Sequence, residues 1–509
     1  MTSAQICICL TIVAYLCFIT CVGVYFNRKG GGANTDAYYL GGRKLGPLVV
    51  AMSAEASDMS GWLLMGLPGL AYLTGVAEPV WTAIGLAVGT YFNWLLVARR
   101  LRRYSARLGA ITIPDFFSRR YRDDRHVLAC IAAVIIVIFF VPYVASGFKA
   151  VGTLFSSLFG VDYHTAMLVG AAIIIAYTVL GGFAAVATID LIQSVVMSTA
   201  LVIIVVFGIS QAGGWGQVMA NAQEMTGYLN IFQGHNTATG EVGSYGALTI
   251  ASTLAWGLGY FGMPHILVRF MAIEDEKKLK LSRRVGSIWV VISMGVAVLI
   301  GVVGYSVSKA GRIITLTTSA DSETVVVQLA DLLSQYGVIF ALVAGIVLAG
   351  IMACTMSTAD SQLLAASSSM SQDILRNFFG MKMSNQTSML VARGTVVAIA
   401  VIGVVLAWNP NSSVFRIVSF AWAGFGGSFG ALMLFSLFWK RTTKAGALAG
   451  MVVGGVMVFV WKFGVATLGG AWAIYELLPA FLLSGAAIVI VSLATPAPEQ
   501  EIVRTFEEI

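Results

Sequence analysis

The sequence predicts an all-α integral membrane protein with about thirteen transmembrane helices. Of its 509 residues, 58% are hydrophobic and only 11% are charged, whereas soluble domains carry about 25% charged residues. Apolar runs of roughly 20 residues, long enough to cross a bilayer, recur along the whole chain. We expect spans at residues 4–26, 47–75, 77–98, 127–150, 164–182, 188–212, 246–271, 285–308, 337–368, 388–408, 413–438, 446–468 and 472–495.

The net charge of +7 does not indicate nucleic acid, because the basic residues gather in short loops between alternate spans. The loops after the first, third, seventh and eleventh spans are rich in Lys and Arg, while the loop 213–245 has neither. By the positive-inside rule the N-terminus lies outside and the C-terminus inside, which requires an odd number of spans. The first span has its basic residues after it, so we expect a retained helix rather than a signal peptide.

We expect one transmembrane domain, residues 1–495, because no loop is long enough to fold alone. Residues 496–509 form a short, acidic cytoplasmic tail, which we expect to be mobile. In the basic loop 99–126, Pro114 suits the start of a short interfacial helix, although we favour a solvated loop that only sets the orientation. All six cysteines lie in predicted spans without metal-site spacing, so we expect no disulfide. No obligate protein partner is evident.

The second predicted span contains the segment 53–69, SAEASDMSGWLLMGLPG, which is unusually polar. An acid at membrane depth costs roughly 2.5–3.5 kcal/mol on insertion scales, so Asp58 should face the bundle interior or a cation. Asp58-Met59-Ser60-Gly61 is a poor helix, because Asp and Ser compete for backbone hydrogen bonds and Gly loosens the chain. A break there frees carbonyls that can line a cavity or bind an ion. We interpret the segment as a cation site; the alternative is a small-residue packing face with a satisfied acid.

A matching interruption occurs five spans later. Trp62 is followed by Gly66-Leu67-Pro68, and the segment 256–261 is followed by Gly262-Met263-Pro264. Gly/Pro-interrupted helices in corresponding positions of two halves indicate a transporter binding site. Five is an odd number, so the halves have opposite orientations. We therefore predict a five-plus-five inverted-repeat transporter fold with discontinuous helices, the repeats spanning approximately 47–212 and 246–438.

The ninth span adds hydroxyl and carboxyl oxygens. Ser357, Asp360 and Ser361 share one helical face, and hydroxyls together with freed carbonyls form an oxygen cage for a hard cation. The alternative is that these hydroxyls only bond back to their own helix.

A second cation site is a further hypothesis. Asp190 and Asp360 should lie at similar depth, and two close carboxylates in low dielectric need a cation or a proton between them. With Ser361 they could hold a second cation. The alternative is that Asp360 is solvated or pairs with an arginine.

The segments 53–69, 256–272 (WGLGYFGMPHILVRFMA) and 356–358 (MST) resemble the sodium/solute symporter family, most closely its bacterial proline-carrying branch. The likeness extends from about residue 38 to 463. It implies sodium-coupled symport of L-proline into the cell by alternating access, with Na⁺ as the coupling ion, in a bacterial-type inner membrane. The alternative is a sodium symporter for another amino acid, a sugar acid or a vitamin.

The resemblance also implies site residues. Sodium would bind the carbonyls of Ala56, Met59 and Cys354 and the hydroxyls of Ser357 and Thr358, with Asp58 in support. The proline pocket would consist of Trp62, Tyr143, Trp256, Tyr260 and Pro264.

Three residues depart from the family pattern: Glu55 replaces a glycine, Cys354 an alanine and Asp360 a small hydroxyl residue. An enzyme is not expected, since no catalytic triad, zinc motif or phosphate loop occurs and the four histidines are scattered. A substrate-gated channel is disfavoured by the two interrupted helices and by the absence of a charged ring in the sequence.

Overall fold

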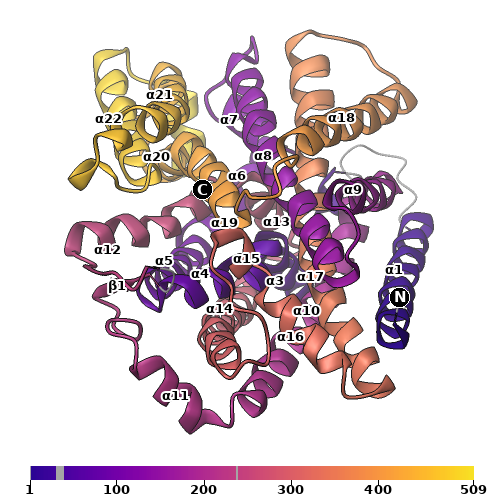
Figure 1. Ribbon diagram of the computed structural model, residues 1–509. Helices are drawn as coiled ribbons and strands as arrows, with labels where there is room; N and C mark the ends of the chain where they lie inside the picture. The colour runs from indigo at the N-terminus through magenta and orange to yellow at the C-terminus, as the bar shows by residue number, and fades with distance from the viewer. Residues whose placement is uncertain (1, 30–38, 181, 237–238) are drawn as a thin grey trace.

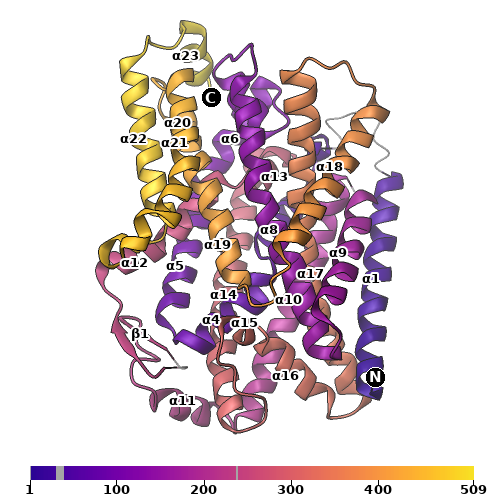
Figure 2. The same cartoon turned by 45° about the horizontal axis from the view of Figure 1, so that its top comes forward.

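The computed structural model describes residues 2–29, 39–180, 182–236 and 239–509. The long helices run side by side as one bundle, with the two chain termini at opposite ends (Figure 2). In this part of the chain the only strands are β1 (Gln233–His235) and β2 (Val242–Ser244), which pair antiparallel in one loop. The predicted all-α class is confirmed.

The first half of the bundle begins with the outlying helix α1 (Ser3–Lys29), seen at one edge in Figure 1. Its further helical elements are η1 (Gly41–Arg43), α3 (Pro47–Asp58), η2 (Trp62–Gly66), α4 (Leu67–Thr74), α5 (Ala77–Phe92), η3 (Asn93–Val97), α6 (Ala98–Leu108), α7 (Ile113–Arg120), α8 (Val127–Phe159), α9 (Tyr163–Leu180) and α10 (Phe183–Gln211).

The second half begins after the loop that carries α11 (Trp215–Gln223) and the two strands. Its helical elements are α12 (Ala247–Leu254), η4 (Ala255–Gly262), α13 (Pro264–Ala272), η5 (Glu276–Lys278), α14 (Leu279–Lys309), α15 (Ser319–Ser322), α16 (Val325–Ser334), α17 (Val338–Ser368), η6 (Ser369–Phe378), α18 (Asn385–Leu406), α19 (Val414–Phe425), η7 (Gly426–Gly430) and α20 (Ala431–Phe438). The chain ends with α21 (Lys444–Phe463), η8 (Val465–Leu468), η9 (Gly470–Trp472), α22 (Leu477–Ala494) and α23 (Gln500–Glu507).

Ten helices in the described ranges are long and apolar enough to cross a membrane without interruption. The other three predicted spans coincide with the interrupted pair α3 and α4, the short helix α9, and the interrupted pair α12 and α13. The number thirteen therefore stays a prediction, whereas a bundle of many membrane-crossing helices is confirmed.

The first interruption lies where the sequence predicts it. Met59 leaves the helical conformation at φ −78° and ψ 73°. As a result, the Ser60 N–H donates to the carbonyl of Asp58 at 2.9 Å instead of the Ala56 carbonyl four residues back. This single diverted bond leaves the Ala56 carbonyl available to another helix.

The second interruption lies between η4 and α13. The tight 3₁₀ helix η4 ends at Gly262, Met263 is extended at φ −78° and ψ 107°, and Pro264 begins α13. Proline disfavours a helical residue before it and has no N–H to lose at the first helical turn. Two glycines allow η4 to lie directly on α5, since a Cβ at Gly89 would come within 2.4 Å of the Gly257 Cα.

The basic loop 99–126 is structured. Thr112 caps α7 by accepting the Asp115 N–H at 3.0 Å, and Pro114 lies in the first turn. Ile113, Phe116 and several of their neighbours are buried. The short helix considered for Pro114 is therefore confirmed, and the solvated loop that we favoured is wrong, because α7 has an apolar face to bury. We call the end of the bundle that carries α6, α7 and η5 the basic end.

The C-terminal tail also packs on the basic end, where α23 lies near α6 in Figure 2. Phe506 is only 7% exposed and lies under the guanidinium of Arg100, 4.7 Å from its ring centroid. Glu508 pairs with Arg107 at 2.7 Å and Glu507 with Lys440 at 2.8 Å. The expectation of a mobile tail is wrong, because α23 buries Phe506 against the bundle and the acidic residues at its end form ion pairs with basic residues elsewhere in the chain.

Candidate functional site

Four of the five predicted sodium ligands meet where α3 ends against the middle of α17. The Ser357 hydroxyl donates to the freed Ala56 carbonyl at 2.7 Å and lies 3.1 Å from the Cys354 carbonyl. The Thr358 hydroxyl donates to the same Cys354 carbonyl at 3.0 Å. All four residues are buried. The fifth, Met59, is also buried and lies at the break itself.

Asp58 joins the broken helix to two others. Its backbone carbonyl accepts the Tyr143 hydroxyl of α8 and the Trp62 indole N–H, each at 3.2 Å. Its carboxylate accepts the Tyr260 hydroxyl of η4 through Oδ2, while Oδ1 has no partner among the described residues. A fully buried carboxylate with a free oxygen is costly unless a proton or a cation compensates it, and this one lies close to the predicted sodium ligands.

The predicted pocket aromatics form a cluster next to this break, which we call the aromatic cluster. The rings of Trp62 and Trp256 lie 6.4 Å apart, and Trp256 stacks on Tyr475 at 5.2 Å. Trp422 closes the cluster, since its indole donates to the Trp256 carbonyl at 2.7 Å and its ring meets Tyr260 edge-on at 5.1 Å. Sequence reasoning missed both added residues, because neither Trp422 nor Tyr475 stands out from the other aromatic residues of the apolar spans.

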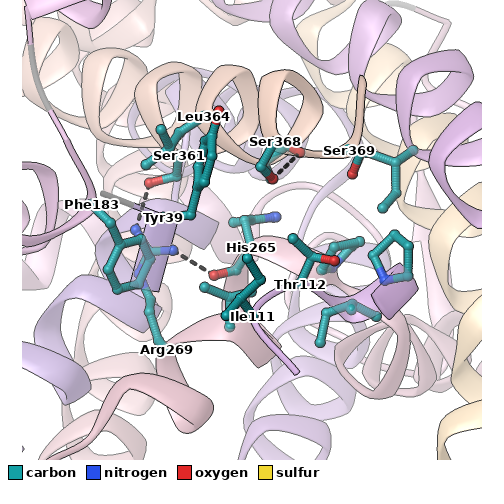
Figure 3. Close-up of a pocket in the computed structure, with 16 residues that line it drawn as sticks. Tyr39, Ile111, Thr112, Phe183, His265, Arg269, Ser361, Leu364, Ser368 and Ser369 are labelled. Carbon is teal, nitrogen blue, oxygen red and sulfur yellow. Dashed lines mark hydrogen bonds between the residues drawn. The ribbon is translucent and has the colours of Figure 1, made fainter. Parts of the chain in front are cut away.

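Pro264, the fifth predicted pocket residue, lies apart from this cluster. It lines a cavity on the basic-end side of the break, together with residues of α13, α17 and the segment before α7 (Figure 3). The aromatic cluster and this cavity therefore consist of different residues, on either side of the second break.

The predicted second cation site contains an arginine that sequence reasoning missed. Arg269 of α13 pairs with Asp190 of α10 at 2.9 Å and donates to the Ser361 hydroxyl at 2.5 Å. Its Nε donates to the Ser53 hydroxyl at 2.6 Å, and Ser53 in turn donates to Asp190 at 2.6 Å. All four residues are buried, so this network joins α3, α10, α13 and α17 through one guanidinium.

Asp360 lies beside this network. Its carboxylate accepts the Thr178 hydroxyl of α9. In the described part of the chain, Asp190 Oδ1 and the Tyr177 hydroxyl have no hydrogen-bond partner. Asp190, Asp360 and Ser361 are thus gathered in one region, with a guanidinium already between two of them.

Glu55, the acid that replaces a glycine of the family pattern, accepts hydrogen bonds from uncharged donors of the neighbouring elements. It accepts the Trp94 indole N–H at 2.8 Å and the Thr90 hydroxyl at 3.1 Å. Gly286 of α14 faces it so closely that a Cβ there would lie 2.9 Å from Oε1. These contacts explain how the chain accommodates an acid where the family pattern has glycine.

The family follows from comparison with known proteins. The model of the sodium:solute symporter family matches residues 38–454. This chain belongs to that family. It is 41% identical to the high-affinity proline transporter PutP of Bacillus subtilis, over 95% of this chain and 98% of the relative. It is 43% identical to the sodium/proline symporter of Haemophilus influenzae, over 93% of this chain and 92% of the relative.

Solved structures support the fold. A Na⁺-coupled sialic acid symporter in a substrate-bound, outward-open state matches 97% of this chain and 99% of its own at a TM-score of 0.79 and 18% identity. Mhp1, a nucleobase-cation-symport-1 family transporter, matches 94% of this chain and 99% of its own at a TM-score of 0.57 and 15% identity. The family member described here is therefore a helical transporter with the expected discontinuous-helix fold, and not an enzyme. The repeat boundaries 47–212 and 246–438 and the domain limits stay predictions.

The Arg269 network yields a stability prediction. Arg269→Gln should shorten the half-life of the purified protein at elevated temperature strongly, because breaking a buried ion pair costs about 3–5 kcal/mol. Arg103→Gln, which removes an exposed partner of Glu276, is the matched control and should cost at most about 1 kcal/mol. Asp190→Asn combined with Arg269→Gln should cost less than the sum of the two single changes. Equal half-lives of Arg269→Gln and Arg103→Gln would contradict the network.

Proposed function

We propose that this transporter couples Na⁺ to L-proline and carries both into the cell by alternating access. The sodium-coupled class rests on family membership, and proline rests on two nearly full-length relatives that are named proline transporters. The structural observation that carries the proposal is the Ala56 carbonyl, freed by the break and met by Ser357 of α17.

For sodium we propose the carbonyls of Ala56, Met59 and Cys354 and the hydroxyls of Ser357 and Thr358. Sodium is a hard cation that prefers oxygen ligands, as calcium and magnesium do. The two hydroxyls now donate to carbonyls, and each can rotate so that a lone pair faces the ion instead. Asp58, buried close by with a free oxygen, offsets the charge of a desolvated cation.

For proline we propose the cluster of Trp62, Tyr143, Trp256 and Tyr260, with Pro264 at its edge. Aromatic walls suit the apolar pyrrolidine ring of proline. The positive end of the helix dipole, at the start of the half-helix that follows the first break, suits the carboxylate of proline. Ala56, the proposed ion ligand, lies at the break. Asp58, two residues later, accepts hydrogen bonds from two of the pocket aromatics, Tyr143 and Tyr260. Ion and solute therefore favour the same arrangement of the break, which is the basis of coupling.

A second cation at Asp190, Asp360 and Ser361 remains part of the proposal. The unpartnered Asp190 Oδ1 supports it. Arg269 weighs against it, because a guanidinium already contacts both Asp190 and Ser361. A cation there would rest mainly on Asp360 and on the oxygen of Asp190 that Arg269 does not use.

We also propose a bacterial-type inner membrane, with the N-terminus outside and the C-terminus in the cytoplasm. The concentration of Lys and Arg at the basic end supports this orientation. Within this proposal the basic end faces the cytoplasm and the cavity of Figure 3 lies on the exit side.

The function is tested with purified protein in proteoliposomes. An inward sodium gradient should drive accumulation of radiolabelled L-proline, and its removal should abolish accumulation. Trp256→Ala should raise the KM for proline at least about tenfold, or about 1.4 kcal/mol, because it removes a wall of the pocket. Trp472→Ala, at an exposed tryptophan, is the control and should leave KM unchanged. Proline uptake indifferent to sodium, or a sugar acid carried in its place, would refute the proposal.

The sodium ligands are tested by the dependence of transport on sodium concentration. Ser357→Ala and Thr358→Ala should each raise the half-saturating sodium concentration about three- to tenfold, and Asp58→Asn should reduce sodium-dependent transport more strongly. Thr395→Ala removes a hydroxyl that bonds only to its own helix at Val391 and is the control. Unchanged sodium dependence in the three site variants would place the ion elsewhere.

Orientation is tested with single accessible cysteines in whole cells. A cysteine at the exposed position Glu241 should react with an impermeant thiol reagent from outside, and one at the exposed position Arg125 only after the cells are opened. Reaction of both positions from the same side would overturn the proposed topology.

A further inference from the structure

The cavity on the basic-end side of the break has a polar lining that the proposed sodium and proline sites do not use. Its polar side chains are Tyr39, Thr112, His265, Arg269, Ser361 and Ser368. They come from α13, from α17 and from segments of the basic end, and Figure 3 shows them facing a common space.

His265 is the unusual member of this lining. Its side chain is only 1% exposed, yet neither ring nitrogen makes a hydrogen bond of normal geometry with a described residue. Buried polar groups in proteins are almost always hydrogen-bonded to protein or to water, so a buried imidazole in a polar cavity indicates a polar occupant there.

The imidazole ring lies next to a member of the aromatic cluster. Its ring centroid lies 6.5 Å from that of Tyr143, which belongs to the cluster, and 5.5 Å from that of Phe140. On the other side it reaches the cavity, where Figure 3 shows it between Ser368 and Thr112. His265 therefore lies beside Tyr143 of the cluster and also lines the cavity.

The chemistry of the lining favours a zwitterion. A neutral imidazole offers one N–H donor and one acceptor nitrogen, which complement the carboxylate and the ammonium of an amino acid. The Ser368 hydroxyl donates to its own helix at Ala365, 2.8 Å away, and so keeps its lone pairs for an ammonium. Arg269 is already neutralised by Asp190, so the cavity suits a ligand without net charge better than an inorganic anion.

We propose that His265 forms an inner binding site for the zwitterionic head of an amino acid, occupied after the solute leaves the aromatic cluster. The inference rests on the proposed transport function and adds a second solute-binding site to it. Such an inner site determines the affinity for solute that enters from the basic end and the rate at which solute is released there. It leaves binding from the opposite end nearly unchanged, because that binding is made in the aromatic cluster.

The test compares the two directions of transport with radiolabelled L-proline. In His265→Leu, the half-saturating proline concentration on the basic-end side of proteoliposomes should rise about tenfold, while that on the opposite side stays within twofold. His265→Asn, which keeps a donor and an acceptor, should restore most of the affinity. His164→Leu, at the start of α9 and away from the cavity lining, is the control. Equal affinities of His265→Leu and the unchanged chain on the basic-end side would overturn the inner site.

A second measurement avoids any folding defect of the His265 variants. Ala365→Cys places a thiol in the cavity lining, and its alkylation can be followed by mass spectrometry. Proline should slow this alkylation at least threefold, also when Trp256→Ala weakens the aromatic cluster. Leu390→Cys, at an exposed position, should not be protected. If proline is transported but leaves the introduced cavity thiol fully reactive, the inner site is refuted alone; if proline neither binds nor is transported, the proposed function fails as well.

Discussion

One diverted hydrogen bond underlies the arrangement of the site. Because the Ser60 N–H turns to the Asp58 carbonyl, the carbonyl of the fully buried Ala56 loses its helical partner. Ser357 of α17 supplies the replacement at 2.7 Å. The middle of the bundle is thus joined by a contact that a cation can take over, since both partners are oxygens.

The same break determines how the pocket is assembled. Asp58 holds α8 through Tyr143 and η4 through Tyr260. A shift of the broken helix would therefore move the proposed ion ligand Ala56 and two of the proposed pocket aromatics together. Within the proposed function, coupling between ion and solute needs no separate relay, because both would act on one short segment of backbone.

Three buried carboxyl groups around this segment have different kinds of partner. Asp190 has a guanidinium partner in Arg269, Glu55 has an indole and a hydroxyl, and Asp58 has a hydroxyl and one free oxygen. An unpaired carboxylate in low dielectric is costly. Asp58, which has one hydroxyl partner and one free oxygen, is thus the acid of these three best suited to respond to a bound cation.

The sequence by itself determined the membrane class, the two matched breaks and most of the residues around them. These follow from local properties: apolar runs, intramembrane acids, and Gly/Pro interruptions act within a few residues of their own position. The same local reasoning failed for the basic loop and the tail, where Phe506 and the residues of α7 become ordered only by packing on distant helices.

Only the tertiary structure decided which side chains complete the site. Arg269 lies 79 residues from Asp190, and Trp422 reaches η4 across 166 residues. No periodicity or spacing in one chain encodes such pairings, because the partners meet only when helices far apart in the chain pack together. The free nitrogens of His265 became visible for the same reason: a side chain can be recognised as lacking a partner only after all its neighbours are in place.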